Sequence, residues 1–305
     1  MTRLAISSDQ QVSFSVAKMN SDRAEDTPNG FLISLMMQAP YQPATNYWRA
    51  FEIDEVVRYG FPAGRGLDLG CGDGHLMRII LGSVGSRDLV GLDIDSEETA
   101  IARARKIYRD VLTTPADRMP FSDGEFDYVF SNSVLEHIPN IDGVLREVAR
   151  VLHSGGRFLF TVPGPNFHAS LSGPRSGDRE AYLRDVDSRC AHLRYWDVEQ
   201  WTRSLAEAGL TLAHSHEYLT EAQVQRWDAI ARSTSGMLMR FTGKKKRPIE
   251  IQRSLKIRSP RMRLPRVVAS AFTSLMQLGG GTDGSHVLSQ VGSHSGCLLI
   301  EATRP

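Results

Sequence analysis

Short apolar runs and amphipathic segments alternate through the middle of the chain. The apolar runs have the length of strands, and the amphipathic segments repeat their apolar positions at helical spacing. The predicted strands are 65–70, 88–94, 126–132 and 156–163, and the predicted helices are 74–82, 96–110 and 141–156. We expect Ser96 to cap the second of these helices. Alternation of this kind predicts βαβ units, and therefore an α/β fold with a parallel sheet covered by helices on both faces.

The pattern continues on both sides of this region. Residues 44–60 read as a helix that ends at Gly60, and residues 195–210 read as another helix. Residues 211–219 and 296–305 are apolar enough to form two further strands. We therefore expect a polar N-terminal arm over 1–43, a core over 44–219, an insertion over 220–293 and a last core strand over 294–305. Both the insertion and an irregular stretch over 164–193 are candidates to cover a substrate.

Composition places the chain among soluble globular proteins. It has 305 residues, a formal net charge of +1, 41% hydrophobic residues and 23% charged residues. Its three cysteines are far apart, so they predict no disulfide framework and favour a reducing, cytoplasmic setting. We find no pattern typical of a secretion signal and no run of about 20 apolar residues that could span a bilayer.

The stretch "GLDLGCGDGH" (66–75) carries the clearest chemical information. Gly70, Gly72 and Gly74 follow a predicted strand and lead into a helix. Glycines at such a turn let a ligand approach the backbone, because no Cβ stands in the way. One unit later Asp93 ends the next strand, where an acid accepts hydrogen bonds from the two hydroxyls of a ribose. The alternative is that Asp93 caps the following helix, but Asp95 serves that purpose equally well.

The spacing of the glycines distinguishes a site for a dinucleotide from a site for S-adenosylmethionine. Dinucleotide-binding turns have the pattern G-x-G-x-x-G, whereas this turn has G-x-G-x-G with Asp68 two residues before the first glycine. An acid so close would repel a pyrophosphate, but it suits a ligand that carries an ammonium and a sulfonium. The turn therefore favours S-adenosylmethionine over a nicotinamide cofactor. An NAD(P)-linked oxidoreductase and a non-catalytic S-adenosylmethionine-binding protein are the alternatives.

Four segments together resemble the class I S-adenosylmethionine-dependent methyltransferases, in the small-molecule and glycan branch with an "LPF…FD…LEH" core. They are "GLDLGCGDGH", "VGLDIDSEE", "RMPFSDGEFDYVFSNSVLEHIPN" and "VLREVARVLHSGGRFLFTVP". The resemblance implies a doubly wound, mostly parallel seven-stranded Rossmann-like sheet, with an inserted region before the last strand. It also implies methyl transfer to an oxygen, a nitrogen or a carboxyl group of a small molecule or of a glycan or lipid-linked precursor.

The resemblance also assigns roles to residues. In this family the glycine turn lies under the methionine part of the cofactor, an acid such as Asp68 lies near its ammonium, and Asp93 holds the ribose. Where the family often has an acid that reads adenine, this chain has Pro115, so either Asp117 moves into that role or the backbone at Ala116 takes it. The full set of cofactor residues implied is Tyr47, Arg49, Asp68, Gly70, Cys71, Gly72, Gly74, Asp93, Ile94, Ala116, Asp117, Ser131 and Asn132.

The sequence gives fewer indications of the residues that bind and activate the methyl acceptor. His137 in "LEHIP" faces the reaction cleft in the resembled fold, so it is a candidate general base with Glu136 to orient it; alternatively it only packs beside the cofactor. His192 and Arg194 are candidate substrate contacts. His214 and His216 alternate on a strand and share one face, a spacing compatible with a metal but more typical of a polar surface. We therefore expect no metal.

The insertion contains a strongly basic stretch. Ten Lys and Arg residues and a single acid lie within 244–266, followed by apolar residues at helical spacing up to Met276. Such a segment is typical of contact with an anionic membrane through 244–278, and it also suits a phosphorylated acceptor. The simpler interpretation, a helix packed on the domain behind a solvated loop, is favoured. Nucleic acid ranks lower because no aromatic residues accompany the charges. The sequence leaves the oligomeric state open.

Overall fold

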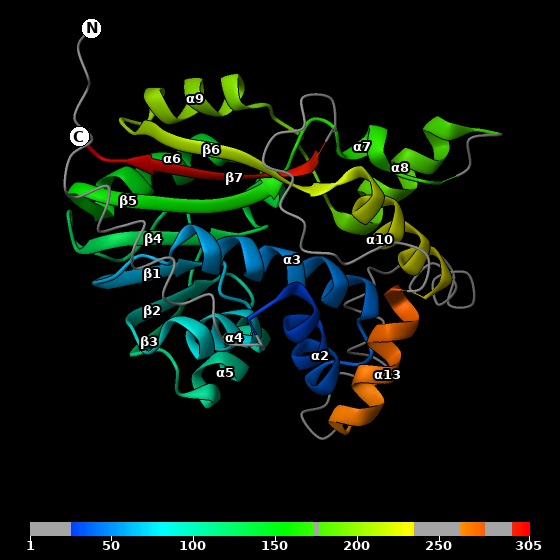
Figure 1. The fold of residues 1–305 in the computed structure, drawn as a ribbon. Helices are drawn as coiled ribbons and strands as arrows, with labels where there is room; N and C mark the ends of the chain where they lie inside the picture. The colour runs from blue at the N-terminus through cyan, green and yellow to red at the C-terminus, as the bar shows by residue number, and fades with distance from the viewer. Residues whose placement is uncertain (1–25, 174–176, 235–262, 278–294) are drawn as a thin grey trace, which may run out of the picture.

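One seven-stranded sheet organises the molecule (Figure 1). The computed structural model describes residues 26–173, 177–234, 263–277 and 295–305. The strands are β1 (Arg65–Leu69), β2 (Asp88–Asp93), β3 (Asp110–Thr113), β4 (Phe126–Asn132), β5 (Leu152–Pro163), β6 (Thr211–Thr220) and β7 (Ser295–Thr303), in the order β3-β2-β1-β4-β5-β7-β6. Strand β7 is antiparallel to both of its neighbours, and the other pairs are parallel. The predicted fold class is confirmed.

Residues that alternate along each strand divide the core into two layers. Tyr128 and Phe130 of β4 point to one face, where they join the cluster formed by α3 (Pro43–Tyr59) and α4 (His75–Val84). Val129 points to the opposite face, where it meets α6 (Ile141–Val151) and α9 (Val198–Glu207). This alternation is the period of two expected for a sheet that is buried on both faces.

The sequence prediction was wrong on several element boundaries. The N-terminal arm is not loose throughout, because α2 (Pro28–Gln38) buries Phe31, Leu32 and Leu35 against α3. Helix α5 (Ser96–Arg105) is capped by Asp95, whose carboxylate accepts from two backbone N–H groups, and not by Ser96. Strand β3 was not predicted, and β5 begins directly after α6 rather than after the glycines.

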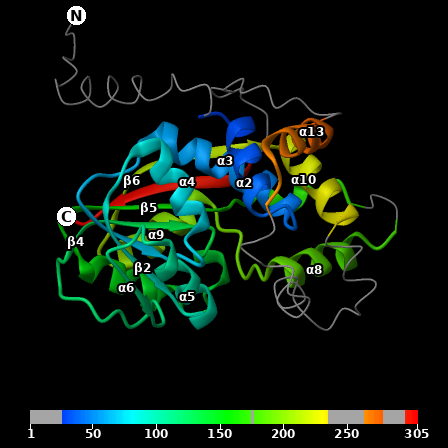
Figure 2. The same cartoon turned by 90° about the horizontal axis from the view of Figure 1, so that it is seen from below.

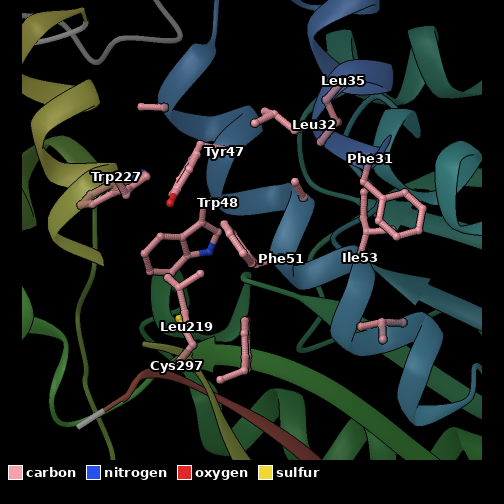
Figure 3. Packing of buried hydrophobic residues seen from close by; sticks show 14 of the residues in the cluster. Phe31, Leu32, Leu35, Tyr47, Trp48, Phe51, Ile53, Leu219, Trp227 and Cys297 are labelled. Atoms are coloured by element: carbon pink, nitrogen blue, oxygen red, sulfur yellow. The ribbon is translucent and has the colours of Figure 1, made fainter. Parts of the chain in front are cut away.

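The stretch 164–193, expected to be irregular, contains α7 (Phe167–Ser170) and α8 (Arg179–Cys190). The insertion over 220–293 contributes α10 (Glu221–Ser233) and α13 (Arg266–Gln277); its basic segment 244–262 lies outside the described residues. Figure 3 shows Trp227 of α10 beside Tyr47 and Trp48 of α3, and the Trp48 and Trp227 rings are 5.2 Å apart. The described helices of both segments therefore belong to the packed structure.

Helix α13 packs on α2 with its small residues inward. Ala269, Thr273 and Met276 are buried, whereas Val267 and Leu275 are 81% and 60% exposed. The packing of α13 beside α2 and α10 is visible in Figures 1 and 2, and Leu264 N–H donates to the Met37 carbonyl at 2.9 Å. Helix α13 therefore packs on the domain, while Val267 and Leu275, two residues of the apolar pattern noted in the sequence, face away from it.

The topology brings the predicted site residues to one edge of the sheet. Strands β1, β2, β4, β5 and β6 run in the same direction, so their carboxyl ends share that edge. The glycine turn follows β1, Asp93 ends β2, and Asn132 ends β4. Helix α7 follows β5 and α10 follows β6 at the same edge, where open α/β sheets bind their ligands.

Candidate active site

The glycine turn after β1 is held against β2. The N–H groups of Gly70 and Cys71 both donate to the Leu92 carbonyl, at 2.7 and 3.0 Å. Gly70 and Gly72 have φ of +78° and +52°, a region that favours glycine. A Cβ on Gly70 would overlap Val134, whereas a Cβ on Gly72 would meet nothing within 4 Å. The turn therefore presents bare backbone to open space at Gly72.

Asp93 connects the turn to the end of β2. One carboxylate oxygen accepts from Gly72 N–H at 2.8 Å and the other from Asp95 N–H at 2.9 Å. Each oxygen keeps a second lone pair for a ligand. Since Asp95 is the helix cap, Asp93 is not needed for capping. The next side chain, Ile94, is 73% exposed, so an apolar surface lies beside this acid.

Asp68 is buried under the same turn. It is 5% exposed and accepts a hydrogen bond from the Tyr108 hydroxyl at 2.6 Å. Burial raises the pKa of Asp68 to about 7, because the charged form loses its hydration. Tyr108 had not been predicted as a site residue, since it lies at the end of a helical pattern with no motif around it. Asp68, with its pKa near neutral pH, therefore lies two residues before the first glycine of the turn.

A buried carboxylate, Glu52 of α3, holds the end of β4. Its oxygens accept from Trp48 Nε1–H at 2.8 Å, Arg49 at 2.7 Å and Asn132 Nδ2–H at 2.8 Å, and also from the Ser133 hydroxyl. Arg49 in addition donates to the Asn132 carbonyl at 3.3 Å. Arg49 and Asn132, each predicted as a cofactor residue, lie together here. Glu52 was missed because an acid in a mixed helix carries no distinguishing pattern.

The remaining predicted cofactor residues have different surroundings. Ser131 is buried and donates to the Leu69 carbonyl at 3.1 Å, which joins β4 to β1. Ala116 is partly buried in the core, and Asp117 accepts from Asn140 Nδ2–H at 2.9 Å. Tyr47 was expected to contact the cofactor, but it is 1% exposed among core residues, and its ring packs edge-on against Phe51. That expectation was wrong, because the ring surface of Tyr47 is already covered by the core.

Residues 191–195 bring His192 to the turn after β4. Leu193 N–H donates to the Glu136 carbonyl at 2.9 Å, and the Arg194 guanidinium donates to the carbonyls of Leu135 and Ile138. Glu136 lies at the centre of the resulting cluster, with its Oε1 at 3.8 Å from His137 Nε2 and 4.0 Å from His192 Nε2. Arg194, predicted as a substrate contact, therefore serves to fasten this segment.

Burial controls the charges of this cluster. It raises the pKa of Glu136 to about 8 and lowers that of His192 to about 3, because both groups lose hydration in their charged forms. His137 is more exposed and its Nδ1 lies 3.0 Å from the Ala191 carbonyl. The structure thus joins His137, Glu136 and His192 at one place, while the role of His137 as a general base stays a prediction.

His214 and His216 lie elsewhere, on β6. His214 Nε2 is 3.1 Å from His216 Nδ1, and His216 Nε2 is 3.1 Å from a carboxylate oxygen of Glu55. Tyr59 stacks on the His214 ring with centroids 5.1 Å apart. These contacts agree with a polar surface network, which was the favoured interpretation of the pair.

The sheet and the position of these residues are those of a Rossmann-like α/β domain with its candidate ligand site at the carboxyl edge of the sheet. Comparison with known proteins defines the family. Residues 67–160 match a family model described as a methyltransferase domain. Over these residues the chain has a methyltransferase domain, in agreement with its resemblance to the class I S-adenosylmethionine-dependent methyltransferases.

Relatives with this domain act on different acceptors. The chain is 32% identical over 108 residues to a malonyl-acyl-carrier-protein O-methyltransferase of Legionella pneumophila, which is 34% of this chain and 38% of that protein. It is 35% identical over 141 residues to 24-methylenesterol C-methyltransferase 2 of Oryza sativa, which is 41% and 39% of the two chains. Both matches span less than half the length of the relative, so they leave the acceptor open.

A solved structure supports the fold. The cyclase SpnF superposes with a TM-score of 0.51 and 20% identity, and the match covers 84% of this chain and 81% of that chain. At this identity the likeness concerns the fold alone.

The site residues fit S-adenosylmethionine. Gly72 offers backbone without a side chain, Asp93 keeps lone pairs for the ribose hydroxyls, and exposed Ile94 offers a surface for the adenine ring. Asp68 lies two residues before Gly70, buried and bonded to the Tyr108 hydroxyl. The pattern of two acids flanking a bare turn is unsuited to a pyrophosphate, which agrees with the cofactor of the family.

Proposed function

We propose that this protein transfers the methyl group of S-adenosylmethionine to an oxygen, a nitrogen or a carboxyl group of a small molecule or of a glycan or lipid-linked precursor. One observation carries the proposal: in the glycine turn, the Gly72 N–H donates a hydrogen bond to the Asp93 carboxylate at the carboxyl edge of the sheet, next to exposed Ile94. The methyltransferase domain match and the named relatives support the same reaction class.

When bound, S-adenosylmethionine supplies an electrophilic methyl group on a positively charged sulfur. The protein then has to hold the donor and the acceptor in line and to exclude water. Asp93 would bind the ribose and Asp68 the ammonium. Arg49, held by Glu52 and the Asn132 carbonyl, would meet the carboxylate. Glu136 and His137 follow β4, and His192 lies in the segment that connects α8 to α9. These three residues lie together and would face the acceptor.

Asp93→Asn tests the donor site. Loss of the carboxylate weakens the hydrogen bonds to the ribose, and a hydrogen bond to a charged group is worth about 2 kcal/mol, or about thirtyfold in affinity. Calorimetry with S-adenosylhomocysteine should show this loss. Asp88→Asn is the matched control, since Asp88 begins the same strand in an exposed ion pair with Arg109. Equal affinity of Asp93→Asn and wild type would count against the assigned site.

A screen of acceptors with methyl-labelled donor tests the reaction itself. Hydroxyl, amine and carboxyl acceptors should be offered separately, because only a hydroxyl needs strong activation. Transfer to one class would establish the acceptor type. Donor binding without transfer to any acceptor would favour the non-catalytic binding protein instead.

We also infer that α13 contacts an anionic membrane surface. Val267, Phe272 and Leu275 lie on its outer side, 81%, 49% and 60% exposed, and Arg263 and Arg266 at its start are exposed as well. An exposed apolar stripe next to basic residues suits a surface of anionic lipid headgroups. In the described part of the chain, no helix combines the length and the hydrophobicity needed to cross a bilayer.

A further inference from the structure

Hydrogen bonds to backbone carbonyls fix the segment 191–195 against the turn formed by Leu135–His137. They run from Leu193 N–H to the Glu136 carbonyl and from Arg194 to the carbonyls of Leu135 and Ile138. His137 Nδ1 reaches back to the Ala191 carbonyl at 3.0 Å. Each segment donates hydrogen bonds to the other, although they are more than fifty residues apart in the sequence. The side chains of the two segments are therefore held in fixed positions relative to one another.

The hydrogen bonds also fix the tautomers of the two histidines. A carbonyl only accepts, so His137 Nδ1 carries the proton and its Nε2 has a lone pair. His192 Nδ1 lies 3.0 Å from the Tyr195 hydroxyl, which itself donates to Asp187. The hydroxyl oxygen therefore accepts from His192 Nδ1–H, and His192 Nε2 also has a lone pair. Both Nε2 atoms lie about 4 Å from Glu136 Oε1, at 3.8 and 4.0 Å.

Glu136 completes a set of three acceptors. It is 1% exposed, and neither of its carboxylate oxygens has a hydrogen-bond partner in the described structure. Arg49 and Arg194 lie near it, but Arg49 donates to Glu52 and the Asn132 carbonyl, and Arg194 to the two carbonyls already named. Buried polar atoms are normally paired, so an unpaired buried carboxyl facing two lone pairs is suited to bind a cation.

We propose that Glu136, His137 and His192 bind a divalent transition-metal ion of the zinc type. One ligand atom from each of the three lies within 4.8 Å of the others. Two imidazoles and one carboxylate are a donor set typical of zinc sites that keep positions open for a substrate, whereas magnesium and calcium prefer oxygen alone. Bonds of about 2.0–2.1 Å place tetrahedral ligands about 3.4 Å apart. The two distances from Glu136, 3.8 and 4.0 Å, therefore have to shorten by about half an ångström, and the two histidines have to approach each other as well.

The surroundings match those of metal ligands. Ligating histidines commonly donate their second N–H to a carbonyl or, directly or through another group, to a carboxylate. Here His137 faces the Ala191 carbonyl, and His192 is linked through Tyr195 to Asp187. The role of the ion rests on the proposed function: bound beside the acceptor, it would lower the pKa of an acceptor hydroxyl and hold the oxygen in place. This departs from the expectation of no metal.

Zinc binding to the full chain tests the proposal without donor or acceptor. After dialysis against a chelator, calorimetry should show one Zn²⁺ per chain, and Co²⁺ should give the absorption spectrum of a site with nitrogen ligands. Glu136→Gln and His192→Gln should each weaken binding at least tenfold, because each removes one of three ligands. His214→Gln is the control, since it alters a histidine pair outside the cluster.

Three results would overturn the proposal: no stoichiometric ion, unchanged affinity in Glu136→Gln and His192→Gln, or loss of binding only in His214→Gln. Thermal unfolding and affinity for S-adenosylhomocysteine, measured on the same variants, show whether they are folded. Zinc binding without affinity for S-adenosylhomocysteine would retain the metal site and reject the proposed function. Affinity for S-adenosylhomocysteine without zinc binding would reject the metal site and leave the proposed function standing.

Discussion

Asp68 and Asp93 show how the surroundings of one residue type determine its contribution. Asp93 accepts two backbone N–H groups at the end of β2, so its position is set by the turn that it helps to hold. Asp68 has the Tyr108 hydroxyl as its hydrogen-bond donor and is more deeply buried, which is why its pKa rises to about 7. Both acids could be selected from the sequence because they stand at strand ends beside glycines. Tyr108 could not, because its contact with Asp68 is made across forty residues of chain.

The raised pKa of Asp68 predicts a pH dependence of donor binding. The ionised carboxylate attracts the ammonium of the cofactor, so affinity for S-adenosylhomocysteine should be highest above pH 7. It should fall below that value as Asp68 takes up a proton, by at most about tenfold per pH unit. Calorimetry between pH 5.5 and pH 8.5 on the wild type measures this effect. Asp68→Asn should bind more weakly at pH 8 and flatten the profile; an unchanged profile in that variant would assign the pH dependence to another group.

The same shift predicts an opposite effect on stability. A carboxyl whose pKa is higher in the folded state than its ordinary value of 3.8 binds protons more tightly when folded, so its contribution to stability falls as pH rises from about 4 to 7. Above pH 7 the ionised form is buried at a cost. Asp68→Asn should therefore unfold at a higher temperature than wild type at pH 8 without cofactor. A lower unfolding temperature would show that the Tyr108 hydrogen bond outweighs desolvation.

At the scale of elements, Glu52 fastens α3 to the end of β4. Its buried carboxylate accepts from Trp48 and Arg49 of its own helix and from Asn132 and Ser133 across the site. Glu52→Gln would leave Arg49 without its buried partner, which costs about 3 kcal/mol of unfolding free energy. Urea unfolding measures the loss. Glu55→Gln, one turn away in a partly exposed pair with His216, should change stability by less than about 1 kcal/mol. Similar values for both variants would contradict this role.

A strand or helix could be predicted when its own sequence pattern determines it, and could not when contacts with a distant segment determine it. Strands β1, β2, β4 and β5 are buried apolar runs, and α6 has one apolar face, so both appear in the sequence pattern. Helix α2 was missed because its apolar residues are not arranged on one side and a polar segment precedes it. The direction of α13 depends on small residues, Ala269 and Thr273, that fit against α2. That choice is made by a partner helix more than two hundred residues away.

At the scale of the whole molecule, the topology gathers the site from the entire chain. Residues of α3, β1, β2, β4 and the segment before α9 meet at one edge of the sheet, and α7 and α10 leave the same edge (Figure 1). The donor side could be predicted from the glycine turn and its resemblance to a family. The residues of the acceptor side could be named as candidates, but their arrangement could not be predicted, because His192 reaches Glu136 only through contacts of 191–195 with the turn after β4.

Membrane contact through α13 is a prediction at this scale. Vesicles that contain an anionic phospholipid should sediment the protein, and zwitterionic vesicles should sediment much less. Replacing both Phe272 and Leu275 by serine should weaken binding severalfold, because it removes exposed apolar area from the stripe. Ile101→Ser on α5 is the control, since it also removes an exposed apolar side chain. Equal sedimentation of all variants, or of both vesicle types, would argue against this contact.

The account depends most directly on the identity of the ligand at the glycine turn. Calorimetric titration of the full chain with S-adenosylhomocysteine and, separately, with NADH measures it. We predict saturable binding of one S-adenosylhomocysteine per chain and no heat from NADH. Saturable binding of NADH, with none of S-adenosylhomocysteine, would contradict the central claim.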